Sequence, residues 1–377
     1  MVFLDFNLSI PVKVISGENC VKENASLFAP FGKRCLIVTG KHSAKLSGAL
    51  DDVISALEEN GIGYETYDGM GENPLLSSCH EAGKKANAFS ADFIVGIGGG
   101  SALDGAKAAA VYATNPDFSF KDIYAAAVRN RALPLILIGT TAGTGSEVGR
   151  VAVLTDGETG RKKSIAYEDC NPALTFADYR YTESMPYSVT VSTALDALAH
   201  AVEGWFSSKC GDIPTLFAEK GIPMIWQGLK TLESEKKVPD KSVRESLYYG
   251  SLYSGITLAY CGTAFPHPLG YVLTENYGVP HGMACAVFMP ALIDRASEFE
   301  SKKLERLLAL TGETKESFKA LVSSLVNVGD IKMTEAEIKK HCARWQDAAP
   351  KNFIFSPGGF SKEEAEKLFE DLFLEKF

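Results

Sequence analysis

The chain alternates short runs of branched apolar residues with segments in which apolar positions recur every three or four residues. Four strand-like runs lie in its first half: residues 34–40, a run around Tyr64, residues 91–100 and residues 133–141. Residues 47–60 and 77–88 between them have the spacing of helices. Strands that alternate with helices predict a parallel sheet covered by helices, in which ligands bind beyond the carboxyl ends of the strands.

Strand-like runs disappear after about Met185, and long helical patterns continue to the end of the chain. Ser192 and Thr193 offer a start for the first of these helices. We therefore predict two domains. The first is an α/β domain with a Rossmann-like parallel sheet over residues 1–185, and the second is an all-α domain over residues 186–377.

The composition excludes several classes of protein. Of the 377 residues, 46% are hydrophobic and 23% are charged, which are the proportions of a soluble globular protein. The net charge of -9 argues against binding to nucleic acid or to an anionic membrane, because both partners are negatively charged. The chain has no run of about 18 apolar residues that would span a membrane. Residues 1–14 alternate apolar with polar positions, which predicts a strand rather than a secretory signal peptide.

Eight cysteines are scattered along the chain, and none of them forms a C-x-x-C pair. This spacing differs from the dense framework that cross-links small secreted domains, so we expect most of the eight to be buried thiols. Because no export signal is seen either, the sequence predicts a cytoplasmic protein.

A glycine-rich turn joins the run at residues 91–100 to a helical segment, in the string VGIGGGSALDGAKAAA. Its glycines let the backbone approach a ligand closely, and the N–H groups at the start of a helix favour an anion such as pyrophosphate. The candidate residues are Gly98, Gly99, Gly100 and Ser101. Ser101 stands where the dinucleotide fingerprint G-x-G-x-x-G requires its third glycine. Taken alone, the turn is as compatible with a structural role as with a nucleotide site.

A second turn, TTAGTGSEV, follows the apolar run LPLILIG. It gathers hydroxyl groups at the end of a strand, where they can bind a nucleotide or its ribose. These hydroxyls belong to Thr140, Thr141, Thr144 and Ser146. An ordinary Ser/Thr turn explains this string equally well when it is considered alone. Two such turns at the ends of neighbouring strands favour a dinucleotide site.

A candidate metal site lies in the helical half of the chain. Asp196 and His200 stand four residues apart in a helical pattern, so their side chains share one face. A histidine at this spacing more often pairs with its own aspartate than binds a metal. Two further histidines, His267 and His281, lie beside prolines and glycines in the strings FPHPLGYVL and GVPHGMACAVFMP, where a turn histidine is the alternative.

One carboxylate and three imidazoles together suit Fe(II), Zn(II) or another first-row divalent ion. Beside a nicotinamide cofactor, such an ion would polarise a carbonyl oxygen while hydride moves between the substrate carbon and the ring. The remaining histidines, His42, His80 and His341, lack such partners in the sequence, and we interpret them as surface or cofactor-side residues.

Four motifs follow one another along the chain: GGGSALDGAK, TTAGTGSEV, DALAHAVEG and HPLGYVLTENYGVPHG. In this order, and over nearly its whole length, the chain resembles the iron-containing (group III) alcohol dehydrogenase family. The resemblance implies an N-terminal nucleotide-binding α/β domain and a helical, metal-binding C-terminal domain, a fold shared with dehydroquinate synthase and glycerol dehydrogenase. It also implies an NAD(P)-dependent alcohol dehydrogenase (EC 1.1.1.-) that forms a homodimer through its first strand.

The resemblance further implies roles for individual residues. The metal ligands are Asp196, His200, His267 and His281, and the separation of 14 residues between the last two agrees with the family. The pyrophosphate is held by Gly98, Gly99, Gly100 and Ser101. The cofactor is also contacted by Asp104, Thr140, Thr141, Thr144 and Lys163.

Two departures from the family concern the region around His267. Many members carry a histidine four places after this ligand that is proposed to relay protons, and here that place is Tyr271. Proton release then goes through Tyr271, the ribose hydroxyls or water. Pro266 and Pro268 flank His267, so we expect the helix to begin at or after His267.

A third departure concerns the cofactor. Relatives that prefer NAD often place an aspartate after the first strand, where its carboxylate would repel a 2′-phosphate. Here the strand ends in VTGKHSAKLSG, in which Gly40 leaves room for a phosphate. Lys41 and Ser43 can hold that phosphate, with Lys45 as a further candidate. We therefore expect NADP(H) in preference to NAD(H), the alternative being that these are solvated loop residues.

The first hypothesis is a metal-dependent, NADP(H)-linked alcohol dehydrogenase that works as an aldehyde reductase on small primary alcohols or aldehydes. We expect one divalent metal, Fe(II) first and Zn(II) second. A polyol (phosphate) dehydrogenase or a dehydroquinate-synthase-like lyase on the same fold is the alternative. Both would need basic residues around the metal, and the sequence near His267 and His281 offers none. A non-catalytic nucleotide- or metal-sensing protein is a third hypothesis, against which the presence of all four candidate ligands argues.

Overall fold

The computed structural model describes residues 9–125 and 129–375, which group into two compact units. The α/β unit contains Ser9–Pro186 and Asp240–Gly255, and the helical unit contains Tyr187–Pro239 and Ile256–Phe377. None of the helices in this described part of the chain combines the length and the apolar character needed to cross a bilayer.

Six parallel strands form the sheet of the α/β unit, in the order β1-β8-β5-β4-β2-β3. Their bounds are β1 (Lys13–Ser16), β2 (Arg34–Thr39), β3 (Gly63–Tyr67), β4 (Phe93–Gly98), β5 (Leu135–Gly139) and β8 (Leu174–Ala177). A separate antiparallel pair consists of β6 (Ala152–Thr155) and β7 (Lys162–Ile165). The carboxyl ends of β2, β4 and β5, three neighbours in this order, therefore lie along one edge of the sheet.

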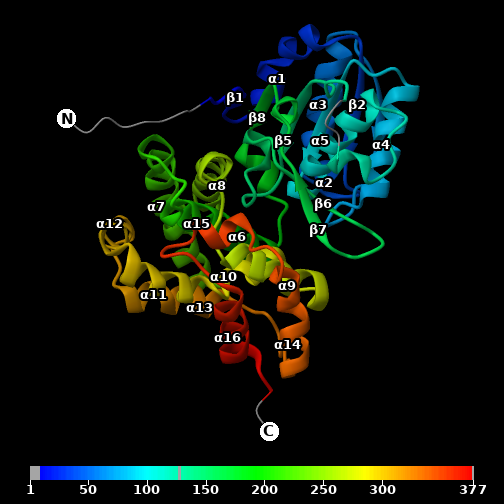
Figure 1. Ribbon diagram of the computed structural model, residues 1–377. Coiled ribbons are helices and arrows are strands. Elements are labelled where there is room, and N and C mark those ends of the chain that lie inside the picture. Colours follow the sequence, from blue (N-terminus) through cyan, green and yellow to red (C-terminus); the bar gives the residue numbers. More distant parts are fainter. Residues whose placement is uncertain (1–8, 126–128, 376–377) are drawn as a thin grey trace, which may run out of the picture. The chain divides into compact units, whose positions relative to one another are not determined.

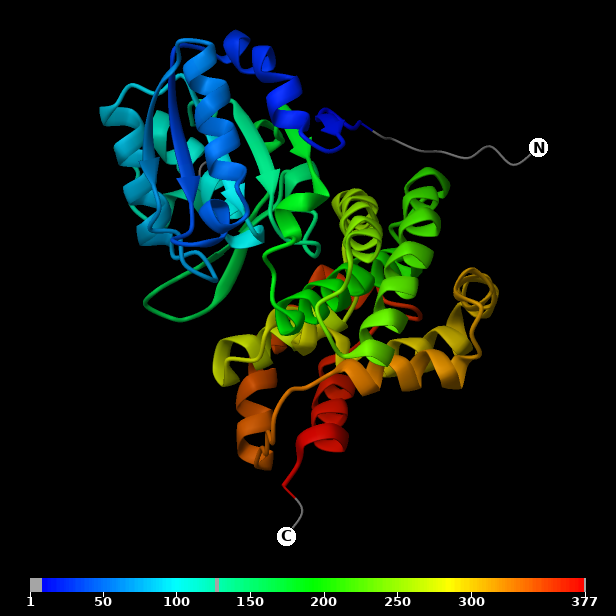
Figure 2. The same ribbon diagram turned by 180° about the vertical axis from the view of Figure 1, so that it is seen from behind.

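Helices cover both faces of this sheet (Figures 1 and 2). They are α1 (Cys20–Glu23), α2 (Ser43–Leu46), α3 (Ala49–Glu59), α4 (Leu76–Ala88) and α5 (Gly100–Thr114). Leu36 and Val38 of β2 pack in an apolar cluster with α4 and α5, whereas Cys35 and Ile37 pack in a second cluster with α1 and α3. Successive residues of a strand point to opposite faces, so a strand covered on both sides must be apolar throughout.

Helices form the second unit. They are α6 (Tyr187–Phe206), α7 (Asp212–Glu235), α8 (Lys241–Cys261), α9 (Pro266–Tyr277), α10 (His281–Ala286), α11 (Met289–Phe299), α12 (Ser301–Thr311), α13 (Lys315–Leu325), α14 (Glu335–Cys342), α15 (Lys351–Phe355) and α16 (Lys362–Phe373). From Thr190 to Phe206, every residue of α6 except Thr193 is buried, so α6 is the core helix of this unit. The helix α8 is shared, because its residues up to Gly255 group with the α/β unit.

The predicted fold class is confirmed, since a parallel sheet with helices is followed by a helical region. The strands and helices predicted between residues 34 and 141 are present as β2, α3, β3, α4, β4 and β5. The strand predicted over residues 1–14 falls largely on residues 1–8, which lie outside the described residues, and β1 begins only at Lys13.

Two predicted helix starts are wrong. The helix α6 begins at Tyr187, directly after Pro186, and not at Ser192 or Thr193. Thr193 lies within the helix and donates its hydroxyl to the backbone oxygen of Thr190, so it does not act as a cap. The helix α9 begins at Pro266, one residue before His267. Both flanking prolines fit its first turn, because the N–H groups there have no partner within the helix.

The cysteines follow the prediction with one exception. Cys210 and Cys261 form a disulfide across a sequence separation of 51, which their spacing did not indicate. It joins the loop after α6 to the last residue of α8. The other six cysteines are buried, as expected of most.

The interpretation of His80 as a surface or cofactor-side residue is also wrong, because His80 is buried and its ring nitrogen lies 2.9 Å from the backbone oxygen of Phe118.

Candidate functional site

The helical unit brings the predicted metal ligands together from three helices. Asp196 and His200 lie on α6, His267 lies on α9, and His281 is the first residue of α10. The approach of α10 to α6 explains part of this arrangement. A Cβ atom on Gly282 would lie 1.8 Å from the backbone oxygen of Ser192, so only glycine allows the contact that sets His281 beside Asp196.

The ligand-type atoms lie within the range that one metal ion can bridge. Oδ1 of Asp196 is 3.8 Å from Nε2 of His200 and 3.8 Å from Nε2 of His281. The ring of His267 stacks on that of His200 with 4.7 Å between centroids. Asp196, His200 and His267 are buried, and His281 is half-buried. The structure thus places all four side chains in one group, and their role as ligands stays a prediction.

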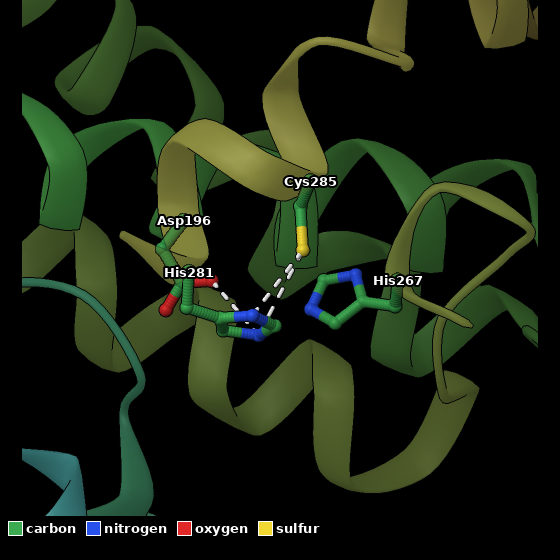
Figure 3. A group of neighbouring side chains, drawn as sticks. All are labelled: Asp196, His267, His281 and Cys285. Atoms are coloured by element: carbon green, nitrogen blue, oxygen red, sulfur yellow. Dashed lines mark hydrogen bonds and ion pairs between the residues drawn. The ribbon is translucent and has the colours of Figure 1, made fainter. Parts of the chain in front are cut away.

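Cys285 is a further member of this group that the sequence analysis did not single out. Ligand atoms of Asp196, His267, His281 and Cys285 all lie within 4.8 Å of one another. Figure 3 shows the sulfur of Cys285 beside the ring of His281, with the imidazole of His267 pointing toward both. The signal in the sequence was the spacing of four residues between His281 and Cys285, which puts both on one face of α10.

Glu203, three residues after His200 on α6, is also missing from the predicted site. It is fully buried, with Oε1 2.7 Å from Nδ1 of His267 and Oε2 accepting the backbone N–H of Ala264 at 2.8 Å. A carboxylate at Nδ1 fixes the orientation and tautomer of the ring, so that Nε2 is presented as the ligand atom. Burial raises the pKa of Glu203, and the charge of His267 opposes that shift.

Tyr271, the candidate proton relay, lies against the same group. Its ring stacks on the ring of His281, with 5.3 Å between centroids and 14° between planes. It is half-buried and lies one turn after His267 on α9. The phenol is therefore within the neighbourhood of the candidate ligands, and its proton-relay role stays a prediction.

In the α/β unit, the predicted nucleotide residues gather at the carboxyl ends of β2, β4 and β5. Gly99 precedes α5, and a Cβ there would lie 3.1 Å from the side chain of Thr141. A Cβ on Gly100 would lie 2.5 Å from the side chain of Thr144. The first N–H groups of this 15-residue helix, which have no partner within the helix, therefore lie beside the side chains of two threonines.

The loop after β2 joins this edge. Gly98 has a φ of +149°, which glycine adopts without strain, and a Cβ added there would meet the hydroxyl of Ser43 at 3.6 Å. Lys41 is exposed, and Gly40 is half-buried, where an added Cβ would lie 3.1 Å from the backbone oxygen of Met70. Ser101 accepts the backbone N–H of Asn73 at 3.2 Å. The three loops that the sequence analysis singled out thus meet at one edge of the sheet.

Thr140 offers a test of whether this edge fits a nucleotide. Its hydroxyl oxygen is buried, and within the described residues it has no hydrogen-bond partner. Buried hydroxyls in proteins are nearly always satisfied, by protein, water or ligand. Thr140 therefore has a hydrogen-bonding group at this edge for which the described residues supply no partner.

Three predicted cofactor residues instead contact the protein itself. Asp104 accepts the hydroxyl of Ser146 at 2.6 Å through Oδ1 and the backbone N–H of Val153 at 2.8 Å through Oδ2. The ammonium group of Lys163 lies 4.5 Å from the centroid of the Tyr124 ring. These contacts account for the side chains without a cofactor, and cofactor binding by these three residues stays a prediction.

A buried charged group that the sequence analysis missed lies beneath the threonine-rich turn. Lys107 is fully buried and donates to the backbone oxygens of Ser146 and Val151, each at 2.8 Å, and to the Ser146 hydroxyl at 2.7 Å. Burial lowers the pKa of Lys107. Glu147, the next residue after Ser146, is also buried, and burial raises its pKa to about 7. Lys107 thus links the threonine-rich turn, through Ser146, to Val151.

Comparison with known proteins identifies the relatives of this chain. The model of a family described as "Iron-containing alcohol dehydrogenase" matches residues 11–179. The model of the "Fe-containing alcohol dehydrogenase family, C-terminal" matches residues 190–370. Together the two matches cover residues of both the α/β unit and the helical unit.

Individual relatives agree with these matches. An NADPH-dependent butanol dehydrogenase of Clostridium saccharobutylicum is 30% identical over 332 residues, 85% of this chain and 81% of its own. A sulfoacetaldehyde reductase of Bilophila wadsworthia is 30% identical over 291 residues, 77% of this chain and 74% of its own. The crystal structure of an iron-containing alcohol dehydrogenase from Thermotoga maritima has a TM-score of 0.87 and 32% identity, covering 98% of this chain and 99% of that one.

Proposed function

Because this chain belongs to the iron-containing alcohol dehydrogenase family, we propose that it is an NADP(H)-linked aldehyde reductase for small primary alcohols or aldehydes. Membership makes it an NAD(P)-dependent oxidoreductase of alcohols and aldehydes. The observation that supports the proposal most directly is the convergence of Asp196, His200, His267 and His281 in the helical unit. We further propose that this group holds one divalent metal, Fe(II) or, second, Zn(II).

The donor set fits such an ion. One carboxylate and three imidazoles suit first-row divalent metals, and the 3.8 Å separations between donors match ligands that share one ion. When bound, the ion supplies Lewis-acid polarisation of the substrate oxygen, and the nicotinamide supplies or accepts hydride. The chain itself orients the ligands: Glu203 holds His267 through Nδ1, and Tyr271 packs on His281. In this proposal the phenol of Tyr271 is a candidate to pass a proton toward solvent, beside the ribose hydroxyls and water.

The edge of the sheet in the α/β unit supports nucleotide binding. The N-terminus of α5 carries the partial positive charge that favours a pyrophosphate. We propose that the buried hydroxyl of Thr140, which has no hydrogen-bond partner among the described residues, bonds to the nucleotide. NADP(H) is preferred because Lys41 and Ser43 follow β2 with no carboxylate between them to repel a 2′-phosphate.

The proposal also includes a cytoplasmic homodimer, as the family resemblance implies. In the described part of the chain, β1 is an edge strand of the sheet, and Lys13, Val14 and Ser16 are exposed. An exposed edge strand can pair with that of a second copy.

Steady-state assays will test the proposed reaction. We expect the protein to oxidise NADPH with a graded series of primary aldehydes, to lose this activity on chelation, and to regain it with Fe(II) or Zn(II). A second panel, assayed by reduction of NADP+, contains primary alcohols, phosphorylated polyols and hydroxy acids, because activity confined to the last two would favour the alternative dehydrogenase. Metal-loaded protein that binds NADPH but turns over no member of either panel would contradict the proposal.

Replacement of Lys41 by alanine will test the cofactor preference. We expect the KM for NADPH to rise about tenfold, as for loss of one charge-assisted contact, while the KM for NADH changes little. Lys84→Ala, at an exposed lysine of α4, serves as the matched control. Equal changes for the two cofactors would mean that Lys41 does not contact the 2′-phosphate.

A further inference from the structure

The sulfur of Cys285 belongs to the same group of ligand-type atoms as three of the candidate metal ligands. It is 3.7 Å from Nδ1 and 3.7 Å from Nε2 of His281. It also belongs to the group in which ligand atoms of Asp196, His267, His281 and Cys285 lie within 4.8 Å of one another (Figure 3). Two donors at about 2.0 to 2.3 Å from a shared ion are at most about 4.6 Å apart, so a small adjustment suffices for all four to bind one ion.

The position of this sulfur is set by the packing of two helices. Cys285 is fully buried on α10, four residues after His281. On the neighbouring helix α9, a Cβ added to Gly270 would lie 2.8 Å from the sulfur. Gly270, which lies between His267 and Tyr271 in the sequence, therefore leaves the space that the sulfur occupies.

Other buried cysteines have different surroundings. Cys79 and Cys170 belong to the apolar cluster formed with α4 and α5, and Cys20 and Cys35 belong to the cluster on the opposite face of the sheet. These four are therefore core residues of the α/β unit. Cys285, by contrast, has two histidines and a carboxylate as near neighbours.

We propose that Cys285 is a sulfur ligand of the metal ion, which joins the nitrogen and oxygen donors of the same group. This inference rests on the metal centre of the proposed function. When the ion binds, the S–H bond breaks, a sulfur–metal bond forms, and the proton passes to solvent. Thiolate is a soft ligand, so the centre favours Zn(II) or Co(II) over the harder Mn(II) and Mg(II) more strongly than three imidazoles and one carboxylate would.

X-ray absorption on the zinc-loaded, full-length protein will test this directly. We expect one sulfur scatterer at about 2.3 Å beside nitrogen and oxygen scatterers at about 2.0 to 2.2 Å. The cobalt-loaded protein should show a thiolate-to-cobalt charge-transfer band in the near ultraviolet. A wild-type centre with nitrogen and oxygen scatterers alone, and no such band, overturns the proposal without need of any variant.

Variants will assign the sulfur. Cys285→Ser should lose both the scatterer and the band, whereas Cys342→Ser, at a buried cysteine of α14, should keep them. In competition between Zn(II) and Mn(II), Cys285→Ser should lower the preference for zinc by at least about tenfold. Retention of the sulfur scatterer in Cys285→Ser overturns the assignment.

The same measurements separate this inference from the proposed function. Bound metal with only nitrogen and oxygen ligands, together with aldehyde reduction, leaves the proposed function in place and removes Cys285 from the centre. Protein that binds no divalent metal at all overturns both.

Discussion

Replacement of His267 by alanine is expected to lower kcat for aldehyde reduction by on the order of 10³-fold or more. The variant loses a candidate ligand and also leaves the buried carboxylate of Glu203 without the imidazole that lies 2.7 Å from it. The affinity for NADPH should change little, because the nucleotide residues belong to the α/β unit. Turnover and NADPH fluorescence titration measure the two effects, and metal analysis shows whether the ion is lost.

A second histidine of the helical unit provides the control. His341 lies on α14, where its Nε2 is 3.1 Å from the hydroxyl of Tyr277, and it is not among the candidate ligands. His341→Ala should keep its metal and its activity. Full activity in His267→Ala would show that the group around Asp196 is not catalytic, whatever the α/β unit binds.

The stability of the protein should depend on pH through Glu147. Burial raises the pKa of this carboxyl from its ordinary value of 4.5 to about 7, so the folded state holds the proton more tightly than the unfolded chain. The stabilisation is fully present below pH 4.5 and is lost as the pH rises through about 7. At about 1.4 kcal/mol per pKa unit, the free energy of unfolding should fall by about 3 kcal/mol over this range.

Glu147→Gln should abolish this part of the pH dependence, because glutamine does not ionise. Urea unfolding at pH 5 and pH 8 will measure the difference, and the variant should gain about 2.5 kcal/mol relative to wild type between the two. Glu59→Gln, at the exposed end of α3, is the matched control and should follow wild type. If the free energy of unfolding changed equally with pH in Glu147→Gln and in wild type, the raised pKa of Glu147 would be contradicted.

The sequence predicted those parts of the fold that depend on local pattern. Buried runs such as residues 34–40 and 133–141 specify strands, because only a strand covered on both faces is apolar at every position. The four candidate ligands could also be predicted from the sequence, since histidines are few and lie in distinctive strings. Their meeting in space depends on Gly282, whose close contact with Ser192 joins segments about 90 residues apart and leaves no local pattern.

Other parts of the site had weaker signals. Glutamates are usually exposed, so Glu203 looked like an ordinary surface residue of an amphipathic helix, and only its spacing from Asp196 and His200 marked it. Lys107, in a run of alanines, gave no sign that three oxygens of the protein accept hydrogen bonds from its ammonium group. Cys285 was one of eight scattered cysteines, and its neighbours come from helices that the sequence cannot place against one another.

The shared helix α8 has a consequence for attempts to divide the polypeptide. A fragment that stops at residue 185, the limit that the sequence pattern suggests, would lack Gly255, whose backbone lies against Gly145 in the threonine-rich turn. It would also lack Tyr248, a buried neighbour of Glu147. Chimeras between relatives should therefore exchange residues 240–255 together with the first 186, because a junction placed only between the two sequence halves would separate a helix from the turn it covers.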